Sequence, residues 1–156
     1  MVNNPLLQIK PYGTATWLNT PACSDYKMTS TTLVDSARNS KGFVVATVVR
    51  EGIRKIELKW NFLSMGDYSI LAKMFEGSNT GGTGNFYCYI KYFDTFLNAF
   101  INSEQGFTTT DGTVLGNTTA RLFYVGDRVC DTAKIKLDSS NKPIGFTNVS
   151  LSLIEV

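Results

Sequence analysis

The clearest pattern in the chain is the alternation of apolar and polar residues over 55–60, KIELKW. Ile56, Leu58 and Trp60 fall on one side of an extended chain, and charged residues fall on the other. This pattern predicts a strand with one face in the core and one face in water. The β-branched run FVVATVVR at 43–50 predicts a preceding strand that could be buried on both faces, and the letters EGIR predict a break between the two strands.

Three later stretches also show the pattern of strands. The stretch 85–94, NFYCYIKYFD, carries aromatic or apolar residues on both of its faces. The stretch 120–128, ARLFYVGDR, alternates as far as Gly126 and Asp127, where we expect a turn or a bulge at the end of the strand. The stretch 148–156, NVSLSLIEV, alternates apolar residues with serines and predicts a final strand with one wet face.

Between residues 64 and 76 the apolar period changes to that of a helix. Ser64 is the expected N-cap, and Asp67, three residues later, suits the positive end of the helix. Gly77 is the expected stop signal. Apolar residues recur at spacings of three and four, which predicts a stripe that packs across a sheet. The stripe consists of Tyr68, Leu71, Met74 and Phe75.

Together these elements predict a mainly β (α+β) fold in a single domain over 1–156. We expect an antiparallel β-sandwich or partly closed barrel with one packed α-helix at about 64–76. The polar segments predict an extended arm or loop at 17–42 and surface loops at 77–84 and 102–119. The predicted core cluster is Trp60, Leu71, Phe75, Leu122, Tyr124 and Leu151.

Composition limits the chemistry that the chain can perform. Its 156 residues carry a formal net charge of +2 and include no histidine, which excludes Ser–His and Cys–His catalytic pairs and imidazole metal ligands. The three cysteines form no CxxC motif, and the glycine-rich segment GSNTGGTG lacks the lysine of a P-loop. No apolar run reaches the roughly 18 residues of a membrane-spanning helix. We therefore expect no enzyme activity, cofactor, metal or small-molecule substrate.

An alternative is a small β domain that binds single-stranded nucleic acid. Tyr87, Tyr89 and Lys91 would share one face of their strand, where exposed rings can stack on bases. Arg121 and Phe123 of the neighbouring strand would extend that surface. Aromatic residues are also frequent in strands that are buried in a core or an interface, so the pattern alone leaves both readings open.

The succession of motifs resembles a family of small tail proteins from long-tailed, siphovirus-type phages and prophages of Gram-positive bacteria. The motifs are KIELKWNFLSMGDYSILAKMF, CYIKYFD, RLFYVGDR and NVSLSLIEV, and the resemblance covers residues 33–156 in order. The segment LVDSARNSKGFVVATVVR resembles the polar loop and following strand of such tail components. The chain departs from the family in its GGTG insertion, its long loop at 102–119, and Val156, where the family often has arginine.

The resemblance implies a non-enzymatic structural protein of the virion, made in the cytoplasm of the bacterial host. It implies the β-sandwich-plus-helix fold shared by tail-tube, tail-terminator and distal-tail (baseplate) proteins. These proteins assemble as homo-oligomeric rings, usually hexamers, around a lumen. The expected partners are other copies of the chain and neighbouring phage tail proteins, with DNA only in transit through the lumen and no membrane.

The polar segment 17–42 has little apolar surface to bury by itself. Ordering it costs about 1–2 kcal/mol per residue in backbone entropy, so we expect it to dock on an adjacent subunit or ring. A plain surface loop is the alternative. We expect deletion of residues 25–40 to leave a folded domain that no longer forms rings. Arg38 is singled out because a guanidinium can hold a neighbour's carboxylate or carbonyls in a fixed fork. The predicted interface residues are Asp35, Arg38, Asn39, Lys41 and Gly42.

Overall fold

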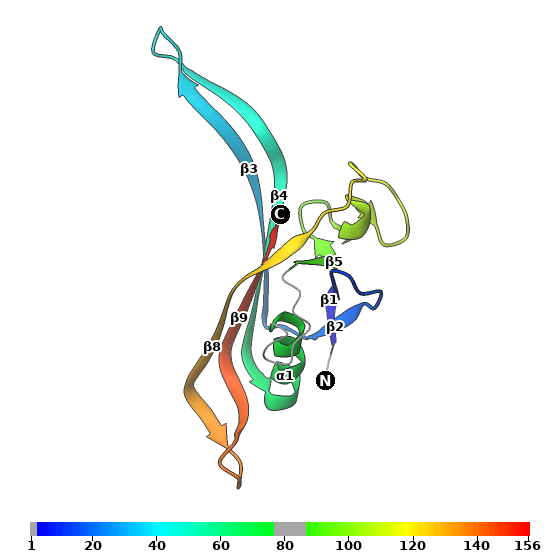
Figure 1. Ribbon diagram of the computed structural model, residues 1–156, viewed down its shortest axis with the longest axis vertical. Helices are drawn as coiled ribbons and strands as arrows, with labels where there is room; N and C mark the ends of the chain where they lie inside the picture. Colours follow the sequence, from blue (N-terminus) through cyan, green and yellow to red (C-terminus); the bar gives the residue numbers. More distant parts are fainter. Residues whose placement is uncertain (1–2, 77–86) are drawn as a thin grey trace.

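The structure is a computed structural model that describes residues 3–76 and 87–156 (Figure 1). The predicted loop at 77–84, with the stop signal Gly77, lies outside the described residues, as do the side chains of 45, 47–49, 127, 131–136 and 143. The elements are β1 (Asn3–Pro11), β2 (Leu18–Pro21), β3 (Asp25–Arg38), β4 (Val44–Ser64), α1 (Met65–Phe75), β5 (Tyr87–Asp94), β6 (Ala99–Asn102), the 3-10 helix η2 (Ser103–Gln105), β7 (Thr108–Thr109), β8 (Phe123–Leu137) and β9 (Pro143–Glu155).

The strands form one open sheet in the order β2-β1-β5-β8-β9-β4-β3, with the short strands β6 and β7 beside β5. The paired strands are antiparallel. The predicted mainly β fold with one packed helix is therefore confirmed. Two long hairpins, β3–β4 and β8–β9, extend from the body in opposite directions (Figure 1).

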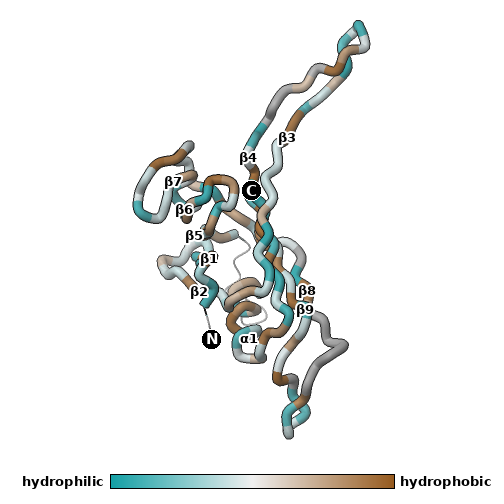
Figure 2. Tube along the Cα trace, turned by 180° about the vertical axis from the view of Figure 1, so that it is seen from behind, coloured by the Kyte–Doolittle hydropathy of each residue, from teal (hydrophilic) through white to brown (hydrophobic). Residues whose placement is uncertain are grey.

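The sheet bends so that strands from its two ends face each other across one core. The Trp60 indole N–H of β4 donates to the Pro21 carbonyl of β2 at 3.2 Å, and the Tyr26 hydroxyl of β3 donates to the Phe93 carbonyl of β5 at 2.8 Å. Helix α1 packs on the same core (Figure 2). The buried apolar side chains are Leu7, Ile9, Ile56, Leu58, Trp60, Leu63, Leu71, Met74, Cys88, Ile90, Tyr92, Ile101, Phe123, Phe146, Val149, Leu151 and Leu153.

The local signals for the helix and for the strand with one wet face are confirmed. Ser64 Oγ accepts a hydrogen bond from the Asp67 N–H at 3.3 Å, and α1 begins at the next residue. In β4, every second residue from Ile56 to Trp60 is buried, while Glu57 and Lys59 between them reach solvent. Of the helical stripe, Leu71 and Met74 are buried, and the two aromatic residues pack against the core from its rim.

At two positions where a strand was predicted to end, the strand continues past a bulge; the bulge at Gly126 was one of the two predicted alternatives. The letters EGIR do not break the strand, because β4 continues through Gly52, which adopts a φ of +70° where the register with β3 shifts. Likewise β8 does not end at Gly126, but runs on to Leu137. Between the pairs Val125–Leu153 and Arg128–Leu151, β8 contains one residue more than β9, which defines a bulge.

The predicted core needs one correction. Leu122 and Tyr124 lie outside the core cluster, whereas Phe123 between them is fully buried. The prediction chose the wrong face of this strand because Arg121, a charged residue, shares the face of Phe123; the structure buries both. The other predicted residues are in place: Trp60, Leu71 and Leu151 are buried, and Phe75 is partly buried against them.

The segment 17–42 divides into two parts. Its inner part contains β2 and the start of β3, where Tyr26 and Met28 pack against the core. Its outer part, from Ser30 onward, has only exposed side chains. A deletion of residues 25–40 would therefore remove the core contacts of Tyr26 and Met28 as well as the arm, so we now expect it to destabilise the domain. The predicted loop 102–119 starts at the end of β6, contains η2 and β7, and is exposed from Thr110 onward.

Candidate assembly surfaces

The strands β8, β9, β4 and β3 form a four-stranded unit, and among the described strands its outer edge at β3 is open. β3 ends the strand order, and β4 is its partner along its whole length. At the other side, β8 pairs with β5 at Phe123 and Tyr124. An open edge presents unpaired backbone N–H and C=O groups that can add another strand. The β3 edge is therefore a candidate for strand addition.

The outer half of the β3–β4 hairpin is the upper arm, which we define as residues 31–53. Strands rise about 3.3 Å per residue, so the stretch from Thr31 to Arg38 projects on the order of 25 Å from the body. The described apolar side chains of the arm include Phe43 and Val44, which are 68% and 62% exposed. An isolated two-stranded hairpin is only marginally stable in water. A partner surface would stabilise this arm.

Four of the five predicted interface residues build the tip of the upper arm. Asn39 Oδ1 accepts hydrogen bonds from the backbone N–H groups of Lys41 at 3.0 Å and Phe43 at 3.1 Å. Gly42 has a φ of +79°, which favours glycine, and Arg38 donates from Nη1 to the Gly42 carbonyl at 2.9 Å. These residues therefore shape the turn, and the Arg38 guanidinium contacts its own hairpin. The fifth residue, Asp35, lies lower in β3, opposite residue 47.

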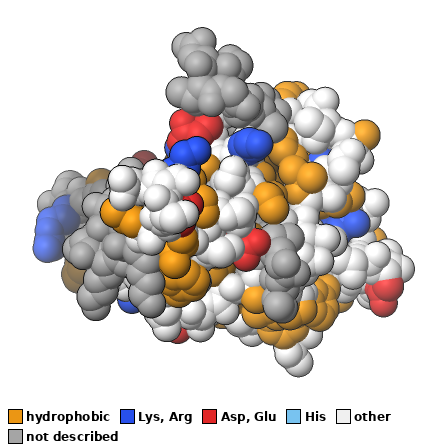
Figure 3. All heavy atoms as spheres, turned by 90° about the horizontal axis from the view of Figure 1, so that it is seen from below, with side chains coloured by type: hydrophobic (Ala, Val, Ile, Leu, Met, Phe, Trp, Pro, Cys, Tyr) orange, Lys and Arg blue, Asp and Glu red, His pale blue; other side chains and the backbone are white. Residues whose placement is uncertain are grey.

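The lower end of the molecule also exposes apolar side chains. Figure 3 shows apolar patches between polar side chains in the view from the β8–β9 end. Phe62 is 55% exposed on β4, and Met65 at the start of α1 and Ile144 on β9 are also exposed. A Cβ at Gly145 would come within 2.4 Å of the Phe62 ring, so the glycine allows this ring to lie flat across β9. Both ends of the long axis thus carry apolar surface.

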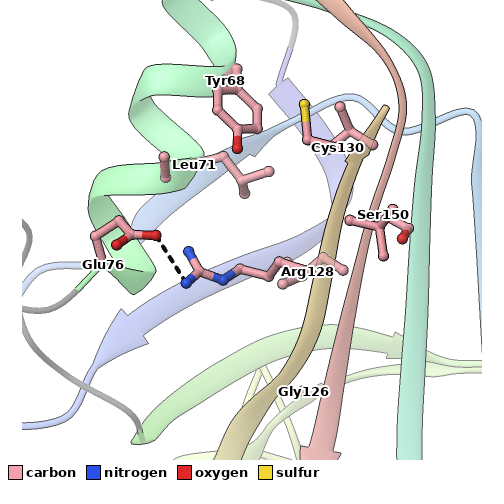
Figure 4. Close-up of a pocket in the computed structure, with 11 residues that line it drawn as sticks. Tyr68, Leu71, Glu76, Gly126, Arg128, Cys130 and Ser150 are labelled. Atoms are coloured by element: carbon pink, nitrogen blue, oxygen red, sulfur yellow. Dashed lines mark ion pairs between the residues drawn. The ribbon is translucent and has the colours of Figure 1, made fainter. Parts of the chain in front are cut away.

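A cleft of about 340 Å³ lies between α1 and the strands β8 and β9 (Figure 4). Glu76, just after α1, and Arg128 of β8 form an ion pair at 3.0 Å across its mouth. Partial burial raises the pKa of the Tyr68 hydroxyl, which points toward Cys130. The cleft is lined by Tyr68, Leu71, Ala72, Glu76, Gly126, Arg128, Val129, Cys130, Val149, Ser150 and Leu151.

The face of the four-stranded unit that points away from α1 is polar. Its lysines and acids alternate: Lys55 contacts Glu57 at 3.0 Å, and Lys27 lies 3.9 Å from the same carboxylate. Ser152, which pairs with Glu57 across β4 and β9, adds a hydroxyl. Opposite charges on neighbouring strands partly neutralise one another, so this face offers no strong site for a polyanion. It is the wet face that the pattern at 55–60 predicts.

A buried network of charges, which local sequence patterns did not reveal, fixes β9 in the core. Arg121 donates to both carboxylate oxygens of Glu155, at 2.8 and 3.1 Å, and the Arg54 backbone N–H donates to the same carboxylate at 2.8 Å. The Arg54 side chain pairs with Asp94 at 2.9 Å, and Asp94 is fully buried. Burial would raise the pKa of Glu155, but the hydrogen bond from Arg121 and the further contacts with Arg54 and Arg50 hold the pKa below its usual value.

The residues of the nucleic-acid alternative do not share one surface. Tyr87 is exposed, and Tyr89 and Lys91 are half-buried on the outer face of β5. Arg121 and Phe123, in contrast, point into the core. The outer face of β5 is also partly occupied: the Lys91 ammonium lies 4.4 Å from the centre of the Trp17 ring, and Tyr12 packs on Tyr89 with ring centres 6.2 Å apart. The predicted five-residue platform is therefore not assembled.

Among the described side chains, cysteines and acids nowhere form a group of three that could hold a metal ion. None of the described helices has the length and apolar character required to cross a membrane. No known protein-family model and no curated protein sequence matches this chain.

Proposed function

We propose that the protein is a non-enzymatic structural subunit of a phage tail, in which copies assemble into a ring around the DNA channel. The ring belongs to the tail tube, the distal tail or baseplate, or the tail terminus, and is hexameric, as is usual in the family that the sequence resembles. The observation that carries the proposal is the edge of β3, which ends the order of the described strands and continues into an arm with exposed side chains.

The directions of the two outer strands, β3 and β8, suit head-to-tail assembly. The four strands alternate in direction, so β3 and β8 run in opposite directions within one copy. When a second copy is rotated about an axis roughly parallel to the strands, its β3 lies antiparallel beside the β8 of the first copy. This interface joins two different surfaces, and such a contact closes into a ring when its rotation divides a full turn. Strand addition in such a contact satisfies the open edge of β3.

The polar face of the four-stranded unit supports an orientation toward the channel. Helix α1 and the β1–β5 layer pack on the other face, which places them on the outside of the ring. A lining in which lysines pair with acids lets DNA pass without holding its phosphates. The upper arm and the β8–β9 hairpin then point along the ring axis in opposite directions, toward neighbouring tail proteins (Figure 1).

The test is the mass and shape of the purified protein at high concentration, with and without a single-stranded oligonucleotide. We expect light scattering to give a multiple of the 17.2 kDa chain, and negative-stain images to show rings in both samples. Antibodies against the protein should label the tails of intact phage particles, and the labelled position distinguishes tube, baseplate and terminus. A chain that stays monomeric at every concentration and binds the oligonucleotide stoichiometrically would favour the nucleic-acid alternative and overturn the proposal.

A further inference from the structure

We infer that the upper arm is a hinged element, which turns at a double bulge in β4 and is held at one angle by a contact between Arg50 and the end of β9. This inference concerns the single chain, so it stands or falls independently of the proposed ring. Its starting point is the place where the arm leaves the sheet. β4 pairs with β9 from Lys55 to Ser64, and beyond Lys55 the described strands supply no third strand beside the β3–β4 hairpin.

Two consecutive bulges lie at the base of the arm. The register between β3 and β4 shifts twice along the stretch of β3 from Thr31 to Val34, and β4 has one extra residue at each shift. Gly52, in the first bulge, adopts a φ of +70°. A bulge interrupts the ladder of hydrogen bonds and bends the strand, so two in succession make this stretch the hinge. The pairs that define the bulges are Thr31–Ile53, Leu33–Arg50 and Val34–Val48.

On the body side of the hinge, the side chain of Arg54 is buried and held by several partners. Its guanidinium donates from Nε to the Asp94 carboxylate of β5 at 2.9 Å. From Nη1 it donates to the Ser30 hydroxyl of β3 at 2.7 Å and to the Gly52 carbonyl at 3.0 Å. One side chain thus joins both strands of the hairpin to the core just before the first bulge. The body therefore ends in a fixed point, and the hinge begins directly beyond it.

On the arm side of the hinge, Arg50 reaches back to the body. Arg50 lies between the two bulges, and its guanidinium donates from Nη2 to the Glu155 carboxylate at 2.6 Å and from Nη1 to the Val156 carbonyl. We call this contact the latch. The Glu155 side chain is 4% exposed and belongs to the core, whereas the Arg50 side chain is 41% exposed. The latch therefore ties a residue of the arm to a fixed residue of the body and sets the angle between them.

The latch can open without damage to the core. When Arg50 leaves, the Glu155 carboxylate keeps its two hydrogen bonds from Arg121. It also keeps the hydrogen bond from the Arg54 backbone N–H. An ion pair with a partly exposed partner contributes little to stability, because water solvates the released cation. The exposed guanidinium is also accessible to a carboxylate of a partner protein, which could replace Glu155. Binding at the base of the arm would then release the arm from its fixed angle.

The test measures the distance between arm and body in the full chain by double electron–electron resonance. Spin labels are attached through a genetically encoded azide-bearing amino acid at two exposed positions, Ser36 on the arm and Gln105 in η2, so the native cysteines stay in place. The labelled chain is diluted with unlabelled chain, so that distances within one copy are measured. We expect Arg50→Met to widen the distance distribution at least about twofold. Glu51→Gln, which removes the neighbouring charge, is the matched control and should leave the width unchanged.

A second pair of labels, at Gln105 and the exposed Lys59 of β4, lies within the body and should keep its width in every variant. Arg50→Lys retains the charge, but a single ammonium lacks the fork that reaches both acceptors, so we expect an intermediate width for the arm pair. Equal widths of the arm pair in the wild type and Arg50→Met would overturn the inference. Widening of the body pair in Arg50→Met would also overturn it, because the contact would then stabilise the body and not the angle of the arm.

Discussion

The inner half of the β3–β4 hairpin belongs to the body of the molecule, and its outer half is the upper arm. The two halves differ in the contacts that stabilise them. In the body, Ile56 and Leu58 are at most 1% exposed and pack against strands from the far end of the sheet. In the arm, Arg50 still contacts Glu155, but the strands beyond it have only each other among the described residues, and every described side chain of β3 is exposed. The comparison teaches that this hairpin serves two purposes: its inner half stabilises the chain, and its outer half is available to a partner.

The largest expected effect is on the body. Trp60→Ala removes the largest fully buried side chain and its hydrogen bond to the Pro21 carbonyl. We expect the free energy of unfolding to fall by about 3–5 kcal/mol, as for other large truncations in a core. Unfolding in urea or guanidinium measures this fall in the free energy of unfolding. A loss below about 1 kcal/mol would contradict the core described here.

A slightly smaller effect is expected for the buried charge network. Glu155→Gln leaves the Arg121 guanidinium buried without its carboxylate, at a cost of about 3 kcal/mol. Asp35→Asn, an exposed acid in the arm, is the control and should change stability by less than about 0.5 kcal/mol. Equal losses in the two variants would show that the network does not stabilise the body.

The same carboxylate predicts a dependence on pH. The folded-state pKa of Glu155 is lowered, so its contribution is fully present above the unfolded-state value and is lost as pH falls through the folded-state value. Stability should therefore decline as the pH drops below the usual glutamate pKa of about 4.3, and less steeply in Glu155→Gln. Unfolding midpoints measured between neutral and acidic pH test this sign. An unchanged slope in the variant would refute it.

Shortening the arm should affect assembly far more than stability. Replacing residues 34–49 by Asn-Gly joins the paired residues Leu33 and Arg50 through a two-residue hairpin turn. We expect the free energy of unfolding to change by less than about 1 kcal/mol, because no described side chain of the removed part belongs to the core cluster. Contacts with neighbouring rings, measured as stacking in electron micrographs, should be lost. Normal stacking would show that the arm has no role in assembly.

The smallest effect is expected at the tip. Phe43→Ala removes an aromatic ring from a position that is 68% exposed, so the stability of the single chain should change by less than about 0.5 kcal/mol. The phenyl ring of Phe43 would be buried only against a partner. The informative measurement is the difference between the melting behaviour of the single chain and that of the assembled protein. A loss in the single chain as large as that of Trp60→Ala would erase the distinction between arm and body.

Much of the fold could be predicted from sequence because several elements are locally coded. The alternation at 55–60 and the Ser64 cap each involve residues close together in the chain, and both are confirmed. The face of the strand at 120–128 could not be predicted in this way. Arg121 looks like a surface residue until Glu155, 34 residues away, pairs with it inside the core.

The candidate assembly surfaces were predictable only in part. The letters DSARNSKG indicated a projecting segment, and the structure places them at the tip of the arm and on the strand that leads to it. The place of β3 at the end of the strand order and the cleft beside β8 depend on which strands pair, and local sequence patterns do not determine pairing between distant segments. The bulge at Gly126 shows the same limit, because its turn-like residues do not reveal that the strand continues beyond them.

The position of β9 has a consequence for the order of events during synthesis. β9 is the last described strand along the chain, yet it lies in the middle of the four-stranded unit, between β8 and β4. As the chain leaves the ribosome, β4 and β8 have no common partner until residues 143–155 emerge. The β3 edge does not belong to a finished sheet before that moment. In the proposed ring, subunits would therefore join only after β9 has paired, and incomplete chains would stay out of the assembly.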